Sequence, residues 1–234
     1  MHFVPIKSIE SQDIQALHRV REQLVKERTA AANQVRGLLL EYGIPVAQGI
    51  HTLRLALPRI LEDAENELTA LGRELFAERY EWLLQLQQRV ADYDRKIARI
   101  FAQSPLCQRL AKVEGVGPLS ATALVAAVGD GKEFRNGRQL SAWLGLVPRQ
   151  HSSGGKNILL GISKRGDRYL RTLLIHGARA VLYRAGQKTD KRSRWLQALK
   201  GRRGCNRACV ALANKNARVL WVLLAREEPY RQVA

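Results

Sequence analysis

The sequence predicts a mainly α-helical protein. Only 6% of its 234 residues are aromatic, and leucine, alanine, arginine, glutamate and glutamine are abundant, which is a composition that favours helices. Two long segments in the first half repeat apolar residues every three or four positions. The second half shows no sustained alternation of apolar and polar residues, so little β-structure is expected.

The first half is predicted to form a long antiparallel helical hairpin, a coiled coil. Ser8 and Ser11 suit helix N-caps, and the first helix should run to Tyr42 before Gly43, Ile44 and Pro45 end it. A loop over residues 49–58 leads to a second helix over residues 59–102. The expected buried stripes are Ile14, Leu17, Val20, Leu24, Ala31, Val35 and Leu38, then Leu68, Leu71, Leu75, Trp82, Leu86, Val90, Tyr93, Ile97 and Ile100. These stripes would pair within the hairpin or form the seam of a homo-oligomer.

Ser104 and Pro105 mark a predicted boundary between a hairpin domain, residues 1–104, and a compact basic helical domain, residues 105–234. The net charge of +18 lies wholly in the second domain, which has 25 basic and 7 acidic residues against 14 and 14 in the first. Such a charge attracts phosphate backbones. An anionic membrane is the alternative partner, but the basic residues follow turns and glycine-rich loops rather than one amphipathic helix, so nucleic acid is favoured.

Other composition features point to a cytoplasmic protein that associates with the nucleoid. The chain has no run of 18 uncharged apolar residues, and residues 1–10 lack the pattern of a secretion signal, so no membrane partner is expected. Cys107 stands alone, and Cys205 and Cys209 lie four residues apart without histidines at zinc-site spacing. Free thiols are therefore favoured over a metal site.

The segment from Val113 to Gly129 is typical of a helix-hairpin-helix element. Gly115 and Gly117 allow a tight backbone turn, and the alanine-rich helix that follows would present unpaired N–H groups to a phosphate. The alternative is a plain connection between two helices. Because the segment opens the basic half, phosphate contact is the favoured interpretation.

Residues 134–150 are predicted to be mainly scaffold. Leu140, Trp143 and Leu144 have the spacing of a buried helix face, Gly145 would cap the helix, and Pro148 would stop it. Arg149 would emerge at its end, within reach of a phosphate.

The loop from His151 to Lys156 is the strongest candidate for chemistry. A Ser-Ser-Gly-Gly stretch is usually only a loop, but here Lys156, Lys164, Arg165, Arg168 and Arg171 crowd around it. A serine hydroxyl among cations suits attack on a phosphodiester, because the cations would stabilise charge on the phosphoryl oxygens. His151 would be a base only if the fold brought it to the serine.

A second cationic stretch runs from Lys188 to Arg207. Its candidate phosphate contacts are Lys191, Arg192, Arg194, Arg202 and Arg203, with a solvated loop as the alternative. Trp195 would stack on a base or, as favoured, pack into the core with Leu196 and Leu199.

Taken together, these motifs resemble the C-terminal transposase domain of the IS110 (IS116/IS110/IS902 type) insertion-sequence family. The resemblance rests on five strings in order: residues 113–117, the 144–148 turn, the Ser-Ser-Gly-Gly-Lys loop, residues 161–171 and the tail Asn214 to Trp221. It covers roughly residues 105–225, and the helical hairpin resembles the family's central linker. The ordered set is specific, whereas one motif alone would be weak.

The resemblance implies that Ser153 is the nucleophile. It also implies a RuvC-like N-terminal domain with four acidic metal ligands, and a structured guide RNA as partner. This sequence departs from that pattern, because Glu10, Asp13 and Glu22 lie on a helical pattern and do not form a Mg²⁺ cluster. We therefore expect a truncated copy, a fragment or an alternative start that lacks the RuvC-like domain and is inactive alone. No cofactor is expected in this chain, and magnesium is expected only with the missing domain.

Three hypotheses remain. In the first, the chain is a DNA transposase or recombinase of an insertion sequence that exchanges DNA strands through Ser153. In the second, it is a non-catalytic nucleic-acid-binding fragment that pairs with, or inhibits, a full-length transposase. The third, a coiled-coil scaffold, accounts only for the first half.

Overall fold

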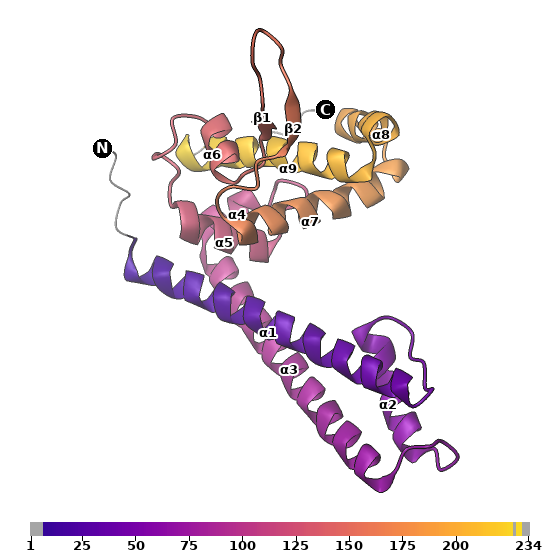
Figure 1. Cartoon of the computed structure of the whole chain (residues 1–234). Helices are drawn as coiled ribbons and strands as arrows, with labels where there is room; N and C mark the ends of the chain where they lie inside the picture. The colour runs from indigo at the N-terminus through magenta and orange to yellow at the C-terminus, as the bar shows by residue number, and fades with distance from the viewer. Residues whose placement is uncertain (1–6, 227, 231–234) are drawn as a thin grey trace. The chain divides into compact units, whose positions relative to one another are not determined.

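The computed structural model describes residues 7–226 and 228–230 and confirms a mainly α-helical fold (Figure 1). The described residues pack into two compact units. Of the described residues, unit 1 comprises 7–15 with 97–226 and 228–230, and unit 2 is Ala16–Lys96. The division into domains at residues 104 and 105 stays a prediction.

Unit 2 is built on two long helices that pair in antiparallel fashion. They are α1 (Ile9–Glu41) and α3 (Ala70–Gln103). Arg21 Nε donates to Asp94 Oδ1 at 2.5 Å, and Arg28 Nη1 donates to Gln87 Oε1 at 2.8 Å. The later residue of α1 thus pairs with the earlier residue of α3, which is the pattern of an antiparallel pair. The predicted antiparallel hairpin is thus observed, whereas its coiled-coil character stays a prediction.

The helix α2 (Ile50–Glu62) corrects the predicted loop over residues 49–58 and the predicted start of the second long helix. Pro58 lies inside α2 although it lacks the N–H that would bond to the carbonyl of Arg54. The Tyr80 hydroxyl donates to that carbonyl instead, at 3.5 Å. Arg73 donates to the carbonyls of Leu61 and Asp63 at the end of α2, both at 2.7 Å, and so caps it.

This extra helix also changes which side of α3 is buried. Leu53 and Leu57 of α2 are fully buried in a cluster with Phe76 and Leu83 of α3. Leu71, Leu75 and Trp82, which the sequence placed in the buried stripe, are 65%, 51% and 37% exposed; Val20 and Leu38 of α1 are also exposed. The predicted stripe was wrong at these five positions. On α3 the reason is that α2 packs against a neighbouring face, the one that carries Phe76 and Leu83.

His18 gives unit 2 a testable dependence on pH. Its side chain is buried, and burial, followed by the charge of Arg21, lowers its pKa from 6.5 to about 4. The unfolded chain therefore binds a proton below pH 6.5 that the folded chain does not. Stability from neutral His18 is complete above pH 6.5 and is lost as the pH falls towards 4.

We expect the free energy of unfolding to fall by about 2 kcal/mol between pH 7.5 and pH 5 through His18. Urea titrations of the wild type and His18→Gln at both values measure it. The variant should lose less stability than the wild type over this interval, and an equal loss would contradict the assignment.

Unit 1 is assembled around α9 (Cys205–Ala225), which contacts four other helices. These are α4 (Pro105–Leu110), α6 (Gly137–Trp143), α7 (Arg168–Arg184) and α8 (Lys191–Arg203); α5 (Pro118–Val128) packs on α4 and α7, and a 3₁₀ turn (Ala185–Gln187) follows α7. Leu212, Ala213, Ala217 and Leu220 of α9 are fully buried in this core.

Among the described residues, α9 is the one helix with the length and composition to cross a membrane. Half of its most apolar stretch is buried against other parts of the protein. A core helix shows the same properties, so this helix is weak evidence for a membrane span.

Candidate nucleic-acid interface

A short β-hairpin carries Ser153 at its tip. Strands β1 (Pro148–Gln150) and β2 (Leu159–Ile162) pair in antiparallel fashion, and the arms continue the pairing as His151 N donates to Ile158 O at 2.9 Å. The hairpin projects beyond the helices of its unit (Figure 1). The sequence predicted only a loop here.

The tip is a tight two-residue turn. Gly154 and Gly155 have φ values of 54° and 77°, and Lys156 N donates to Ser153 O at 3.0 Å. Left-handed conformation at both central positions matches the twist of a hairpin and favours glycine. The turn therefore pairs Ser153 with Lys156, and both residues are exposed.

The two adjacent serines have different roles in the hairpin. Ser152 Oγ accepts a hydrogen bond from Ile158 N at 3.3 Å and so helps to hold the arms together. Ser153 Oγ has no hydrogen-bond partner within residues 7–226 and 228–230, and no contact joins it to His151. The hydroxyl of Ser153 is thus open to solvent, and His151 is not placed as its base.

The hairpin stands on two loops whose backbones touch. A Cβ on Gly145 would lie 2.1 Å from Arg165 O, and a Cβ on Gly166 would lie 1.8 Å from Trp143 O. Both glycines also have positive φ, at 70° and 86°. The prediction that Gly145 caps α6 is confirmed, since its N–H donates to Ala142 O at 2.9 Å just after the helix.

Arg171 holds the same loops from beneath, which corrects its predicted role as a phosphate contact. Its side chain is buried, and Nη1 donates to Leu144 O at 3.1 Å and to Arg165 O at 3.3 Å. A guanidinium used in this way is not available to a phosphate at the surface.

Trp143 is a further correction: it is 39% exposed and packs edge-to-face on Phe134, because the short helix α6 buries Leu140 and Leu144 instead.

Replacing Arg171 by alanine should lower the free energy of unfolding by about 2–3 kcal/mol, because two carbonyls lose their donor. Arg168→Ala is the matched control, since Arg168 is exposed three residues earlier on α7 and should change stability by less than about 0.5 kcal/mol. Urea unfolding monitored by circular dichroism measures both. Equal effects would contradict the structural role of Arg171.

The exposed cations around the hairpin come from three segments. Arg149 lies on β1, Lys156 lies at the tip, and Lys164, Arg165 and Arg168 lie where the chain leaves β2 and enters α7. Lys164 itself has a positive φ of 55°, and its N–H donates to Gly145 O at 3.2 Å. Lys156 therefore lies beside Ser153 at the tip, while the other four predicted cations lie near the base of the hairpin.

Asn214 of α9 holds the segment between α6 and β1 in place. The chemical motifs in the sequence did not identify this residue. Its Nδ2 donates to Ser141 Oγ at 2.7 Å and to Leu146 O at 3.2 Å. Trp221 of the same helix donates to the carbonyls of Gly131 and Phe134. The only indication in the sequence was that the string from Asn214 to Trp221 belongs to the resemblance.

The helix-hairpin-helix-like segment forms as two helices, α4 and α5, joined by a turn. Gly115 has a φ of 89°, and its backbone packs on α7, where a Cβ on Gly177 would lie 1.8 Å from Gly115 O. Gly117 is exposed at the start of α5, with open space where a side chain would be. Gly115 thus serves packing against α7, while the backbone at Gly117 is open to solvent, and phosphate contact by either glycine stays a prediction.

The second cationic group lies on α8, and no hydrogen bond or ion pair within the described residues joins it to the β-hairpin. Lys191, Arg194, Arg202 and Arg203 are exposed. Arg192 instead forms an ion pair with Glu114, which also pairs with Lys188 at 3.1 Å. The predicted phosphate contact through Arg192 is therefore corrected, because its guanidinium is already occupied and half-buried.

The start of α8 is held by Asp190. Its carboxylate accepts from the Ser193 hydroxyl at 2.6 Å and from the N–H groups of Ser193 and Arg192. The hydrogen bond from the Ser193 hydroxyl is the largest of the effects that lower the pKa of Asp190. Trp195 packs against the core, as favoured from sequence, and Lys215 Nζ lies 5.0 Å from the centre of its ring.

The three cysteines are free thiols, as predicted. Burial raises the pKa of Cys107 and of Cys209, while Cys205 is exposed at the first turn of α9. Within the described ranges, no group of three or more histidine, cysteine, aspartate or glutamate residues is arranged to hold a metal ion.

The fold and the site define a helical protein whose cationic unit presents a serine on a short hairpin. Residues 107–194 match the family described as "Transposase IS116/IS110/IS902 family". The chain is 51% identical over 231 residues to a "Transposase for insertion sequence element IS1111A" of Coxiella burnetii, covering 99% of this chain and 64% of that protein. It is 52% identical over 232 residues to a "Probable family 20 transposase" of Pseudomonas aeruginosa, covering 99% and 69%. A "Transposase for insertion sequence element IS1328" of Yersinia enterocolitica is 38% identical over 223 residues, covering 95% and 66%.

At this identity and coverage, the chain belongs to the IS116/IS110/IS902 family of transposases. It spans about two thirds of the length of these relatives.

Proposed function

We propose that this chain binds DNA through unit 1 and contributes Ser153 as the nucleophile in strand exchange during transposition. The observation that carries the proposal is the exposed Ser153 hydroxyl at the tip of a hairpin with a fixed base, where it is paired with the exposed Lys156. Four further exposed cations, Arg149, Lys164, Arg165 and Arg168, lie at the other end of the hairpin. The relatives' names add that such chains are transposases of insertion sequences. The partner in this proposal is DNA in the cytoplasm.

In the proposed step, Ser153 Oγ attacks a backbone phosphorus. A bond from Oγ to phosphorus forms as one phosphorus–oxygen bond of the strand breaks, and the departing strand end takes a proton as a hydroxyl. Lys156, which is paired with Ser153 across the turn, offsets the negative charge that develops on the phosphoryl oxygens, while the cations at the base of the hairpin hold the flanking phosphates. Attack by another strand's hydroxyl on the phosphoserine then releases Ser153 and completes the exchange.

A DNA substrate that loses its leaving strand by diffusion tests this proposal, because the phosphoserine adduct then accumulates. We expect the purified chain, mixed with a full-length relative of the family, to yield a covalent adduct that survives denaturing electrophoresis. A complete lack of adduct on this chain, with adduct on the relative, would contradict the proposal. Addition of magnesium and of the transcribed guide RNA tests both expected partners in the same assay.

The second candidate is a non-catalytic nucleic-acid-binding role in which the chain pairs with a full-length transposase. It is favoured by the observation that no described group is hydrogen-bonded to the Ser153 hydroxyl and could act as its base. This role predicts salt-dependent DNA binding without any adduct. The adduct assay therefore separates the two candidates.

We also propose that the apolar residues left exposed on α3, Leu71, Leu75 and Trp82, join two copies of the chain. Exposed apolar side chains that follow one helix face are a common basis for helix pairing. The double variant Leu71→Glu with Leu75→Glu should halve the mass measured by light scattering. A wild-type chain that is already monomeric at micromolar concentration would contradict this pairing.

A further inference from the structure

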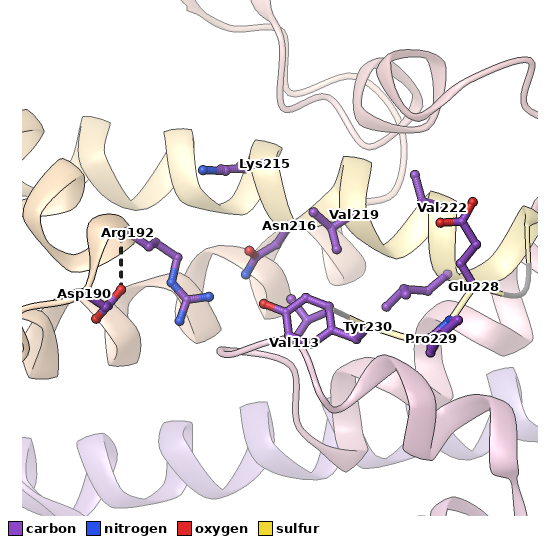
Figure 2. Close-up of a pocket in the computed structure, with 11 residues that line it drawn as sticks. Val113, Asp190, Arg192, Lys215, Asn216, Val219, Val222, Glu228, Pro229 and Tyr230 are labelled. Carbon is purple, nitrogen blue, oxygen red and sulfur yellow. Dashed lines mark hydrogen bonds between the residues drawn. The ribbon is translucent and has the colours of Figure 1, made fainter. Parts of the chain in front are cut away.

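We infer that a pocket between α9, the start of α8 and the segment at residues 228–230 binds an unpaired base of the DNA strand (Figure 2). The inference rests on the proposed function, in that it takes DNA as the ligand of unit 1. It assigns a base-binding role to residues that the hairpin chemistry does not use. The pocket has a volume of about 290 Å³.

The walls of the pocket suit a flat ring. Val219 and Val222 of α9, Val113 and Pro229 supply apolar contacts, and the aromatic ring of Tyr230 lies beside Asn216 and Val113 (Figure 2). Bases stack on aromatic side chains irrespective of sequence. The volume lies near the small end of ligand sites, so it suits one base better than a whole nucleotide.

The polar groups of the pocket favour a neutral occupant with its own donors. Asn216 is buried, and its Nδ2 donates to Glu114 O at 2.9 Å, which fixes the side chain. Its Oδ1 accepts no hydrogen bond from the described residues, so it is available to an N–H of a base. The carboxylates of Asp190 and Glu228 also line the pocket and offset the charges of Arg192 and Lys215, so the lining has no excess positive charge to draw a phosphate into it.

Arg192 also lines the pocket. Its guanidinium pairs with Glu114 through one nitrogen, while Nε is buried without a partner among the described atoms. A buried unpaired N–H is costly. Because this nitrogen is closed off from solvent, the group that the pocket offers to a base edge is the acceptor Asn216 Oδ1.

Phosphates would lie next to the pocket rather than in it. A second hollow of about 470 Å³ shares Lys215, Val219 and Val222 with the pocket and is also lined by Arg138 and Arg218. These three cations are exposed. A strand that passes over α9 can therefore place its phosphates on Arg138, Lys215 and Arg218 while one base enters the pocket.

Fluorescence anisotropy with three labelled DNA duplexes tests the pocket. One duplex is fully paired, one carries a single unpaired adenine, and one carries an abasic residue in place of that adenine. We expect the whole chain to bind the unpaired adenine about tenfold more tightly than the abasic residue. Val219→Phe, which fills the pocket, and Tyr230→Ala, which removes its aromatic wall, should abolish this preference.

Tyr183→Ala is the matched control, because Tyr183 is 89% exposed on α7 and does not line the pocket. It should keep the preference, as should Tyr230→Phe, which retains the ring. Salt-dependent binding of all three duplexes with equal affinity would overturn the pocket while leaving the proposed function intact. Failure of the wild type to bind any of them would overturn DNA binding and the pocket together.

Discussion

Replacing Ser153 by alanine is expected to abolish the covalent protein–DNA adduct while DNA affinity stays within about twofold. The adduct requires the hydroxyl oxygen as nucleophile, and alanine supplies none. Affinity should survive because it arises from the cations, which the substitution leaves in place. Denaturing electrophoresis measures the adduct, and fluorescence anisotropy measures the affinity.

Ser152→Ala is the matched control for this experiment. It removes the neighbouring hydroxyl, which holds the hairpin arms through Ile158 N. Adduct formation should persist in Ser152→Ala, with a yield lowered by no more than about tenfold. An adduct that persists in Ser153→Ala and disappears in Ser152→Ala would transfer the chemistry to the other serine.

Replacing Gly166 by alanine is expected to destabilise unit 1 by about 3 kcal/mol, which corresponds to a Tm lower by about 10 °C. The new Cβ would lie 1.8 Å from Trp143 O, and the backbone would stay at a φ of 86° that alanine rarely adopts. The Trp143 carbonyl lies at the end of α6, beneath the hairpin, so the two loops must separate to make room for the new Cβ. The hairpin that carries Ser153 would then lose its fixed support. Thermal unfolding by circular dichroism measures the effect.

Gly201→Ala provides the matched control. Gly201 lies inside α8 with open space around its Cβ position, and its φ is not positive. Alanine there should stabilise the helix by about 0.5–1 kcal/mol. If Gly166→Ala were as well tolerated as Gly201→Ala, the close contact of the two loops would be refuted.

The fold class and the antiparallel long helices followed from the sequence because apolar spacing reports helical faces directly. The helix α2 was missed because Gly49 and Pro58 read as loop residues. The Arg54 carbonyl that Pro58 leaves without a helical donor accepts from the hydroxyl of Tyr80, which lies 22 residues after Pro58 in the chain. Local patterns carry no information about such a contact, and they could not reveal which face of α3 the missed helix would bury.

The candidate site was predictable in part. Ser153 and the exposed cations near it could be named from residue types and from the resemblance, but the hairpin was hidden by its short strands and glycine turn. Arg168 and Arg171 look equivalent in the sequence, although one is exposed and the other is buried under two carbonyls. Burial of that kind depends on tertiary packing. The roles of Asn214 and Asn216 as anchors of distant loops were unpredictable for the same reason.

The most direct measurement is to digest the trapped adduct with protease and nuclease and to locate the nucleotide remnant by mass spectrometry. Nucleophilic attack by Ser153 predicts a phosphate-linked remnant on the peptide that contains the Ser-Gly-Gly turn, with fragment ions that place it on Ser153. A remnant found on any other residue, with the turn peptide recovered unmodified, would contradict it.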